Sequence, residues 1–161
     1  MPSTMKQVLE NQTLRDDFVK DCVLIIAQQV ESQKDFSGIA MKNAYKLLEK
    51  LTPGATRQAT ELLVDDFAEQ IEPYLQEFSK SHLEYQPLPD FLASKASNIA
   101  ESFLQVTDSK AHTFDSTTIL AFYKTLRPHA KKHVEKAVPD IALLLQKYLV
   151  TPAGIEPASA T

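Results

Sequence analysis

Residues 38–78 have the sequence GIAMKNAYKLLEKLTPGATRQATELLVDDFAEQIEPYLQEF. On both sides of Thr52-Pro53-Gly54, apolar residues recur at spacings of three and four, which predicts two amphipathic helices. Because proline is unfavourable inside a helix and suited to its start, this joint ends one helix and begins the next. The first helix is expected to bury an apolar stripe formed by Ala40, Ala44, Leu47, Leu48 and Leu51.

An altered copy of this hairpin returns near the C-terminus. The matched pairs are Tyr45-Lys46 with Tyr123-Lys124, Thr52-Pro53 with Arg127-Pro128, Asp66 with Asp140, Ile71 with Leu145, and Tyr74-Leu75 with Tyr148-Leu149. We therefore expect a duplicated unit of three helices, with halves at roughly residues 13–80 and 90–149. Such a duplication predicts how the helices are arranged, and it does not indicate a reaction or a ligand.

The composition favours an all-α fold. Only 3 of the 161 residues are glycine, and the abundant Leu, Ala, Gln, Glu and Lys are good helix formers. No window shows the alternating pattern typical of a strand. Six to seven helices can form a single bundle over residues 1–149 or a short α-solenoid, and two units favour the bundle because solenoids usually need about three repeats. Residues 150–161 lack periodicity and are expected to be a disordered tail.

Charge and cysteine content narrow the classes of function. The net charge of −4 disfavours nucleic acid as a partner. The single cysteine, Cys22, lies among apolar residues and indicates a reducing compartment without disulfides. No signal peptide is visible, and the longest apolar run, residues 22–27, is too short to span a membrane. We expect a cytoplasmic protein without a cofactor.

Several elements of the sequence are shared with a known family. They are Gly38-Ile39-Ala40-Met41-Lys42, Tyr45-Lys46, Pro53, Ile71-Glu72-Pro73-Tyr74, and LRPHAKKHVEKAVPDIALLLQKY at residues 126–148. In these elements the chain resembles an uncharacterised family of short all-helical bacterial proteins, common in actinobacteria, whose domain has no known function. The resemblance covers roughly residues 5–149, and it departs from the family's pattern at Asp65 and Leu75, where a proline and an aromatic residue are expected. It implies a helical fold and no reaction, ligand or partner.

Residues at the duplicated positions are candidates for binding a ligand: Tyr45, Tyr74, Tyr123, Tyr148, Asp66 and Asp140. Tyrosines at the edge of a helical stripe usually pack their rings and hydrogen-bond their hydroxyls, and the alternative is that they line a ligand cavity. The two aspartates can converge if the halves face each other, and paired carboxylates perform acid–base chemistry or hold a divalent cation. Otherwise Asp140 lies at the start of a helical segment and Asp66 pairs with a lysine or a tyrosine hydroxyl.

Basic residues gather near the start of the last helix. Arg127, Lys131, Lys132 and Lys136 are candidates for contact with an acidic patch on a partner protein, or they form an ordinary solvated face. His129 and His133, at a spacing of four, can meet one metal ion if Glu135 or His112 joins them. The lysines between them repel cations, so we assign no metal site. No catalytic motif is present, and we assign no catalytic residue.

Three functions remain open. The favoured one is a non-enzymatic protein-interaction domain, whose partner is another protein or a second copy of the chain. The second is a binder of a small apolar ligand in a cavity between the halves. The third is a metal-dependent enzyme that uses the aspartate pair or the histidine pair.

Overall fold

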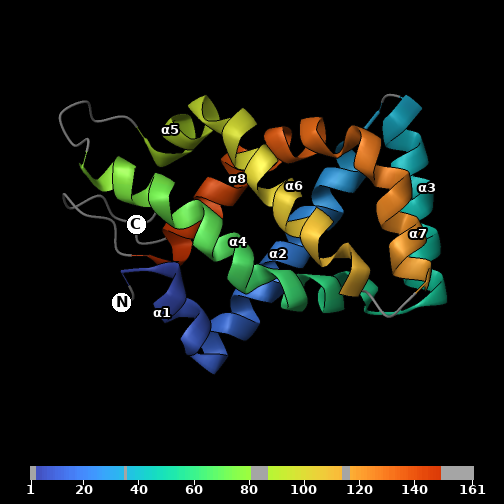
Figure 1. The fold of residues 1–161 in the computed structure, drawn as a ribbon, viewed down its shortest axis with the longest axis horizontal. Coiled ribbons are helices and arrows are strands. Elements are labelled where there is room, and N and C mark those ends of the chain that lie inside the picture. Colours follow the sequence, from blue (N-terminus) through green and yellow to red (C-terminus); the bar gives the residue numbers. More distant parts are fainter. Residues whose placement is uncertain (1–2, 35, 81–86, 114–116, 150–161) are drawn as a thin grey trace.

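The computed structural model describes residues 3–34, 36–80, 87–113 and 117–149 (Figure 1). These residues contain helices and no strand, so the predicted all-α class is confirmed. None of the described helices has both the length and the apolar composition needed to cross a membrane. The predicted tail, residues 150–161, lies outside the described residues. The helices are α1 Met5–Glu10, α2 Gln12–Ser32, α3 Phe36–Leu51, α4 Ala55–Lys80, α5 Leu88–Ser94, α6 Ala96–Lys110, α7 Thr117–Leu126 and α8 Ala130–Tyr148, with 3-10 segments at Ala111–Thr113 and Arg127–His129.

Four long helices form the body of the molecule. α2 packs against α4 and α8, and α6 packs against the same two helices, so the four close into a ring. α1 and α5 lie toward one end of this bundle, and α3 and α7 pair with each other at the opposite end (Figure 1). This closed arrangement is a bundle, whereas a solenoid stacks its hairpins in a row.

The pattern of helix contacts is almost unchanged when α1–α4 are exchanged for α5–α8. α1 contacts α2, α4 and α8, and α5 contacts α6, α8 and α4. The pair α2–α4 corresponds to α6–α8, and α3–α7 corresponds to itself. An internal two-fold would give this pattern, with α3 and α7 meeting on its axis. Each unit would have four helices instead of the expected three, since the short helices α1 and α5 precede α2 and α6. The duplication itself stays a prediction.

The hydrophobic core lies between the four long helices and the short helices α1 and α5. Its largest fully buried side chains are Met5, Val8, Val19, Leu88, Leu92, Ile99 and Val138. Ile71 and Leu145, one of the matched pairs in the sequence, are buried in the same cluster. Burial of an aliphatic side chain of this size contributes roughly 1.5–3 kcal/mol. Among the described residues, none from α3 or α7 belongs to this core cluster.

The turn between α3 and α4 is fixed by a glycine and a glutamate. Gly54 adopts a φ of 82°, a left-handed conformation that glycine accommodates without steric cost. Glu49 of α3 accepts hydrogen bonds from the backbone N–H of Thr56 at 3.0 Å and from its hydroxyl at 2.9 Å. The carboxylate therefore satisfies a donor in the first turn of α4. The predicted break at Thr52-Pro53 is confirmed, since α3 ends at Leu51 and α4 begins at Ala55.

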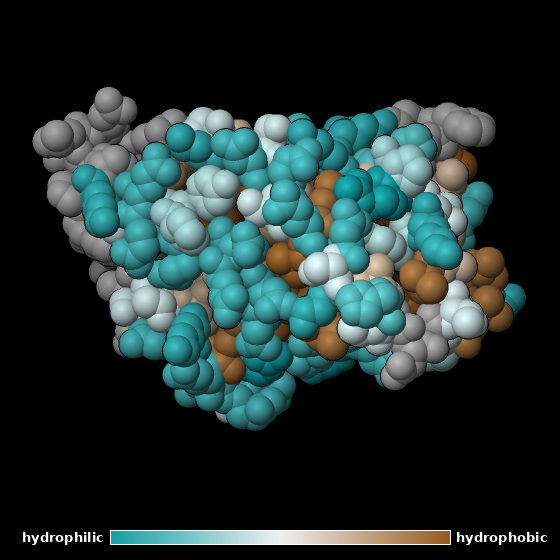
Figure 2. Space-filling view, in the orientation of Figure 1, coloured by the Kyte–Doolittle hydropathy of each residue, from teal (hydrophilic) through white to brown (hydrophobic). Residues whose placement is uncertain are grey.

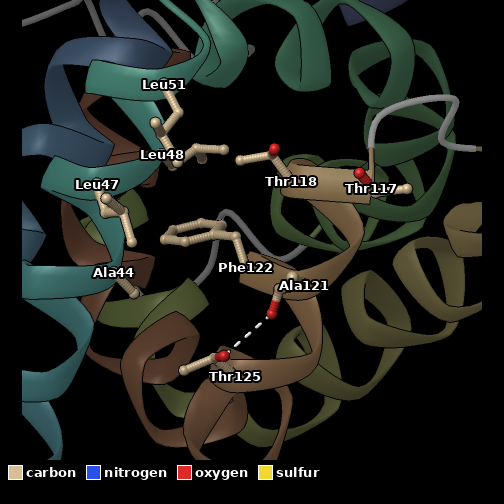
Figure 3. Close-up of a pocket in the computed structure, with 9 residues that line it drawn as sticks. All are labelled: Ala44, Leu47, Leu48, Leu51, Thr117, Thr118, Ala121, Phe122 and Thr125. Carbon is tan, nitrogen blue, oxygen red and sulfur yellow. Dashed lines mark hydrogen bonds between the residues drawn. The ribbon is translucent and has the colours of Figure 1, made fainter.

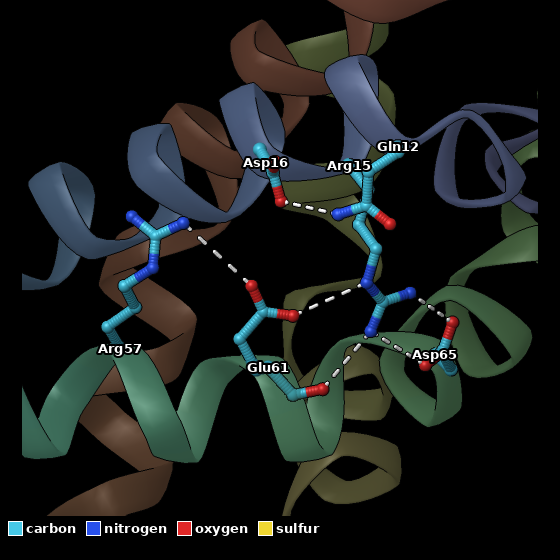
Figure 4. A network of polar contacts seen from close by, with 6 residues as sticks. All are labelled: Gln12, Arg15, Asp16, Arg57, Glu61 and Asp65. Carbon is cyan, nitrogen blue, oxygen red and sulfur yellow. Dashed lines mark hydrogen bonds and ion pairs between the residues drawn. The ribbon is translucent and has the colours of Figure 1, made fainter.

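An arginine joins α2 to α4 (Figure 4). Arg15 Nη1 and Nη2 donate to the two carboxylate oxygens of Asp65 at 2.8 and 3.0 Å, and Nε donates to Glu61 at 3.3 Å. Arg57 lies at 4.0 Å from the other oxygen of Glu61. A two-pronged arginine–carboxylate pair is geometrically specific, so it fixes the register of the two helices.

A second polar contact joins the end of α8 to α2. The Tyr148 hydroxyl donates to Asp21 at 2.6 Å, and Lys147 Nζ donates to the same carboxylate oxygen at 2.9 Å. The Tyr148 ring packs edge-on against Phe18, with 5.2 Å between centroids. Burial raises the pKa of the Tyr148 hydroxyl, and its bond to Asp21 raises it further. Tyr148 thus packs its ring and bonds its hydroxyl at the same place.

Candidate functional site

A groove runs between α3 and α7, at the end of the bundle farthest from α1 and α5 (Figures 1 and 3). Its volume is about 380 Å³. We call it the α3–α7 groove. The residues that line it are Ala44, Leu47, Leu48 and Leu51 from α3, and Thr117, Thr118, Ala121, Phe122 and Thr125 from α7.

The walls of the groove are mainly apolar. Phe122 extends from α7 toward Leu47 and Leu48, as Figure 3 shows. The Thr125 hydroxyl donates to the backbone carbonyl of Ala121 at 3.0 Å, so its hydrogen-bonding capacity is partly used within α7. None of the lining residues carries a titratable side chain. The groove therefore offers apolar contact and two threonine hydroxyls, Thr117 and Thr118, and no acid–base group.

Large leucine side chains reach the solvent at this groove. Leu47 is 56% exposed and Leu51 is 61% exposed, whereas the neighbouring Leu48 is only 3% exposed. α7, whose residues are all described, has no buried side chain although it contains Ile119 and Phe122. In Figure 2, hydrophobic side chains are visible at the right-hand end, over α3 and α7, and in areas near the centre of this face, among mostly polar residues. Apolar surface that gathers in one place marks an interaction site more often than scattered leucines do.

The prediction that the apolar stripe of α3 is buried is wrong for Leu47 and Leu51. Leu48 is buried as expected, whereas the other two leucines and Ala40 are exposed. The reason is that α3 has only one extensive neighbour, α7, and its remaining contacts with α2 and α4 are few. An apolar stripe as wide as the one on α3 needs more than one neighbour to be covered. That mismatch between stripe width and available helices is the signal that could have located the groove.

The candidate tyrosines lie in different places. The ring of Tyr45 lies beside the α3–α7 groove, 6.4 Å from the ring of Phe122. Tyr74 packs against the core cluster. Tyr123 donates to Asp108 and lies 3.1 Å from the Thr107 hydroxyl, and burial followed by the bond to Asp108 raises its pKa. Of the four tyrosines, only Tyr45 adjoins the groove, and the role of all four in ligand binding stays a prediction.

The two candidate aspartates each have their own partner. Asp66 on α4 pairs with Lys110 of α6 at 3.0 Å. Asp140 on α8 accepts a hydrogen bond from Gln29 of α2 at 2.8 Å. If the chain is duplicated as its sequence predicts, the two contacts join corresponding helix pairs. Each carboxylate therefore binds a neighbouring helix, as the structural alternative for Asp66 anticipates, and their use in chemistry stays a prediction.

Most of the candidate basic residues form pairs. Arg127 holds both carboxylate oxygens of Asp108, at 2.8 and 2.9 Å, and its hydrogen bond lowers the pKa of that carboxyl. Lys131 pairs with Glu101 at 2.9 Å, and Lys136 lies 3.5 Å from the side-chain oxygen of Gln33. Lys132 is exposed. Because Arg127 and Lys131 are matched by acidic side chains, their charge is less available to a partner.

Three side chains that could take part in metal or thiol chemistry are His129, His133 and Cys22. His129 is exposed in the 3-10 segment, and His133 is half-buried on α8. Within the part of the chain that the structure describes, no three His, Cys, Asp or Glu side chains gather as a metal site would require. Burial raises the pKa of the Cys22 thiol to about 12, so little of the nucleophilic thiolate is present at neutral pH.

Comparison of the chain with models of protein families gives a match. Residues 5–149 match the model of a family of unknown function, DUF6918. The chain belongs to this family. No curated protein and no solved structure matches it. The predicted membership in an uncharacterised family is confirmed, and the DUF6918 match adds no reaction, ligand or partner. The α3–α7 groove therefore has to be judged on its geometry.

Proposed function

We propose that this chain is a protein-interaction domain and that the α3–α7 groove is its docking surface. The observation that carries the proposal is the exposure of Leu47 and Leu51 beside the half-buried Phe122. Each large aliphatic side chain gains roughly 1.5–3 kcal/mol when it is removed from water. A partner that covers this groove would therefore gain affinity from residues that contribute little to the fold.

The position of the groove fits this role. The core cluster is built without α3 and α7, so the long helices supply a rigid support for them. If the chain is duplicated as its sequence predicts, α3 and α7 are equivalent helices and the groove lies where the two halves meet. Binding sites often lie between the helices of a bundle. We place the protein in a bacterial cytoplasm, in keeping with its single cysteine and the family it resembles.

A small apolar ligand is the second candidate for the groove. The volume of about 380 Å³ falls within the range of small-molecule sites, roughly 300–1,000 Å³. Such sites bury most of the ligand, however, and Leu47 and Leu51 are more than half exposed. The open shape fits a protein surface better.

Site-specific cross-linking in cells tests the proposal. A photo-cross-linking amino acid replaces Leu51 in the groove, and in a matched control it replaces Leu143, which is 50% exposed on α8. We expect a defined protein, identified by mass spectrometry, to cross-link from position 51 and not from position 143. That protein is then purified and its affinity measured with the unmodified chain.

Substitution of the exposed leucines completes the test. Leu47→Gln combined with Leu51→Gln should weaken binding of the identified partner by about 100-fold, the equivalent of two partly covered leucines. Leu143→Gln should leave the affinity unchanged. Equal cross-linking from positions 51 and 143 would overturn the proposal. An affinity for the partner that is unchanged by the Leu47→Gln and Leu51→Gln substitutions would overturn it too.

A further inference from the structure

We infer that the occupant of the α3–α7 groove is an amphipathic helix whose apolar face is flanked by carboxylates. This inference rests on the proposed function and adds the chemistry of the partner.

The two helices that form the groove are strongly basic for this chain. α3 and α7 together carry Lys42, Lys46, Lys50 and Lys124, against a single acidic residue, Glu49. The whole chain has the opposite balance, with 17 basic and 21 acidic residues. The positive charge is therefore concentrated on the same helices that expose the leucines.

The one acidic residue of these helices is already bound. Both carboxylate oxygens of Glu49 accept hydrogen bonds at the start of α4, one from Gly54 at 3.3 Å and the other from Thr56. Among the residues that the structure describes, none forms an ion pair with Lys46, Lys50 or Lys124. This separates them from Arg127 and Lys131, whose acidic partners are in place.

Two of these lysines, Lys50 and Lys124, lie beside residues that line the groove. Lys50 follows Leu47 by three residues on α3, which makes it a neighbour of that leucine on the helix surface, and Lys46 lies one turn before Lys50 on the solvent side. Lys124 follows the groove residue Ala121 by three residues on α7 and adjoins it in the same way. All three are exposed. A partner seated on the leucines thus has ammonium groups along both edges.

The shape of the groove favours a helix as the occupant. Its lining residues recur along α3 at spacings of three and four, as the ridges of a helix do. An amphipathic helix fills such a groove with residues at the same spacings, and residues beside its apolar face then lie over the rims. Acidic residues at those places would meet Lys50 and Lys124, with Lys46 one turn away from Lys50.

Two other occupants fit less well. A second copy that presents the same face would bring lysines against lysines, and like charges at close range oppose association. An anionic membrane would attract the lysines, but it offers a flat surface to a concave groove, and the chain's net charge of −4 opposes the approach.

Peptide binding tests the inference with defined probes. Three peptides of about 18 residues, long enough to form a helix, share one apolar face and carry Glu, Gln or Lys beside it. Fluorescence anisotropy with the full chain measures their affinities. We expect the Glu peptide to bind about 10-fold more tightly than the Gln peptide, since each exposed pair contributes modestly. This preference should shrink as salt is added.

Charge reversal identifies the responsible lysines. Lys46→Glu combined with Lys50→Glu should remove or invert the preference for the Glu peptide. Lys6→Glu combined with Lys80→Glu, exposed on α1 and α4, changes the net charge equally and should leave the preference intact. Circular dichroism confirms that each variant keeps its helices.

The remaining outcomes overturn the inference in distinguishable ways. If the Glu and Gln peptides bound equally well and Leu47→Gln abolished the binding of both, the partner would not need to be acidic. The proposal that the chain is an interaction domain would still stand. If none of the three peptides bound, the inference of an acidic helix as partner would also be rejected. The cross-linking experiment would then test the proposed function separately. Binding to phosphatidylserine vesicles that Lys46→Glu and Lys50→Glu abolish would indicate a lipid surface. A dimer in sedimentation equilibrium that Leu47→Gln dissociates would indicate a second copy.

Discussion

The rings of Tyr45 and Phe122 lie 6.4 Å apart, with their planes tilted by 56°, and they join α3 to α7. Phe122 also lines the groove, so it takes part both in this helix pair and in the proposed docking surface.

Phe122→Ala should therefore affect two measurements. Because Phe122 is half-buried, its loss should lower the free energy of unfolding by about 1–2 kcal/mol, less than the 3–5 kcal/mol typical of a fully buried phenylalanine. The affinity for the partner should fall as well. Urea denaturation measures the first effect, and an unchanged stability would show that the two rings do not hold α3 and α7 together.

Two adjacent leucines test the geometry of the groove. Leu48→Ala should destabilise the protein by about 2–4 kcal/mol because Leu48 is 3% exposed and its loss leaves a cavity. Leu47→Ala should change stability by less than about 0.5 kcal/mol because Leu47 is 56% exposed. Thermal and urea denaturation of the two variants give the comparison. Similar losses from both would mean that α3 is packed on its outer side too.

Stability at high pH should depend on Tyr148. Its pKa in the folded protein is raised above the unfolded value of about 10, so its contribution is complete below that pH and is lost as the pH rises through the folded pKa. Tyr148→Phe should cost about 1–2 kcal/mol at neutral pH, since it removes the hydrogen bond to Asp21. Above pH of about 10, the variant should lose less stability with rising pH than the original chain. If the free energy of unfolding of the two proteins fell equally as the pH rose above about 10, this contribution of Tyr148 would be ruled out.

Arginine geometry can be tested on α2 and α4. Arg15→Lys keeps the charge but cannot make the two-pronged contact with Asp65, so the free energy of unfolding should fall by about 1 kcal/mol. Arg57→Lys is the matched control, because Arg57 lies 4.0 Å from Glu61 and is half exposed. The control should lose almost nothing. Equal effects from both substitutions would show that the Arg15 geometry is unimportant.

Much of the fold could be predicted from the sequence because it depends on local patterns. The spacing of apolar residues and the Thr52-Pro53 joint predict the α3–α4 hairpin, and the helix-forming composition without an alternating pattern favours helices over strands. Pairing between distant helices is different, since nothing in the local pattern of α3 says that α7 is its neighbour. The matched residues Ile71 and Leu145 do occupy the core together, which suits the predicted duplication.

The candidate site was harder to predict for a physical reason. Apolar spacing shows that Leu47, Leu48 and Leu51 share one side of α3, but it cannot show how many helices cover that side. Tyr123 and Tyr148 attract notice because they recur at matched positions, yet their hydroxyls bond Asp108 and Asp21 within the fold. The residues that line the groove form no recognisable sequence motif, so they can be identified only in the packed structure.

Backbone amide hydrogen exchange of the full chain, with and without the cross-linked partner, tests the docking surface most directly. We predict slower exchange in the segments that line the groove, residues 44–51 and 117–125, and unchanged exchange in residues 138–148 of α8. Slower exchange in α8 with no change in α3 and α7 would contradict the assignment of the groove as the docking surface.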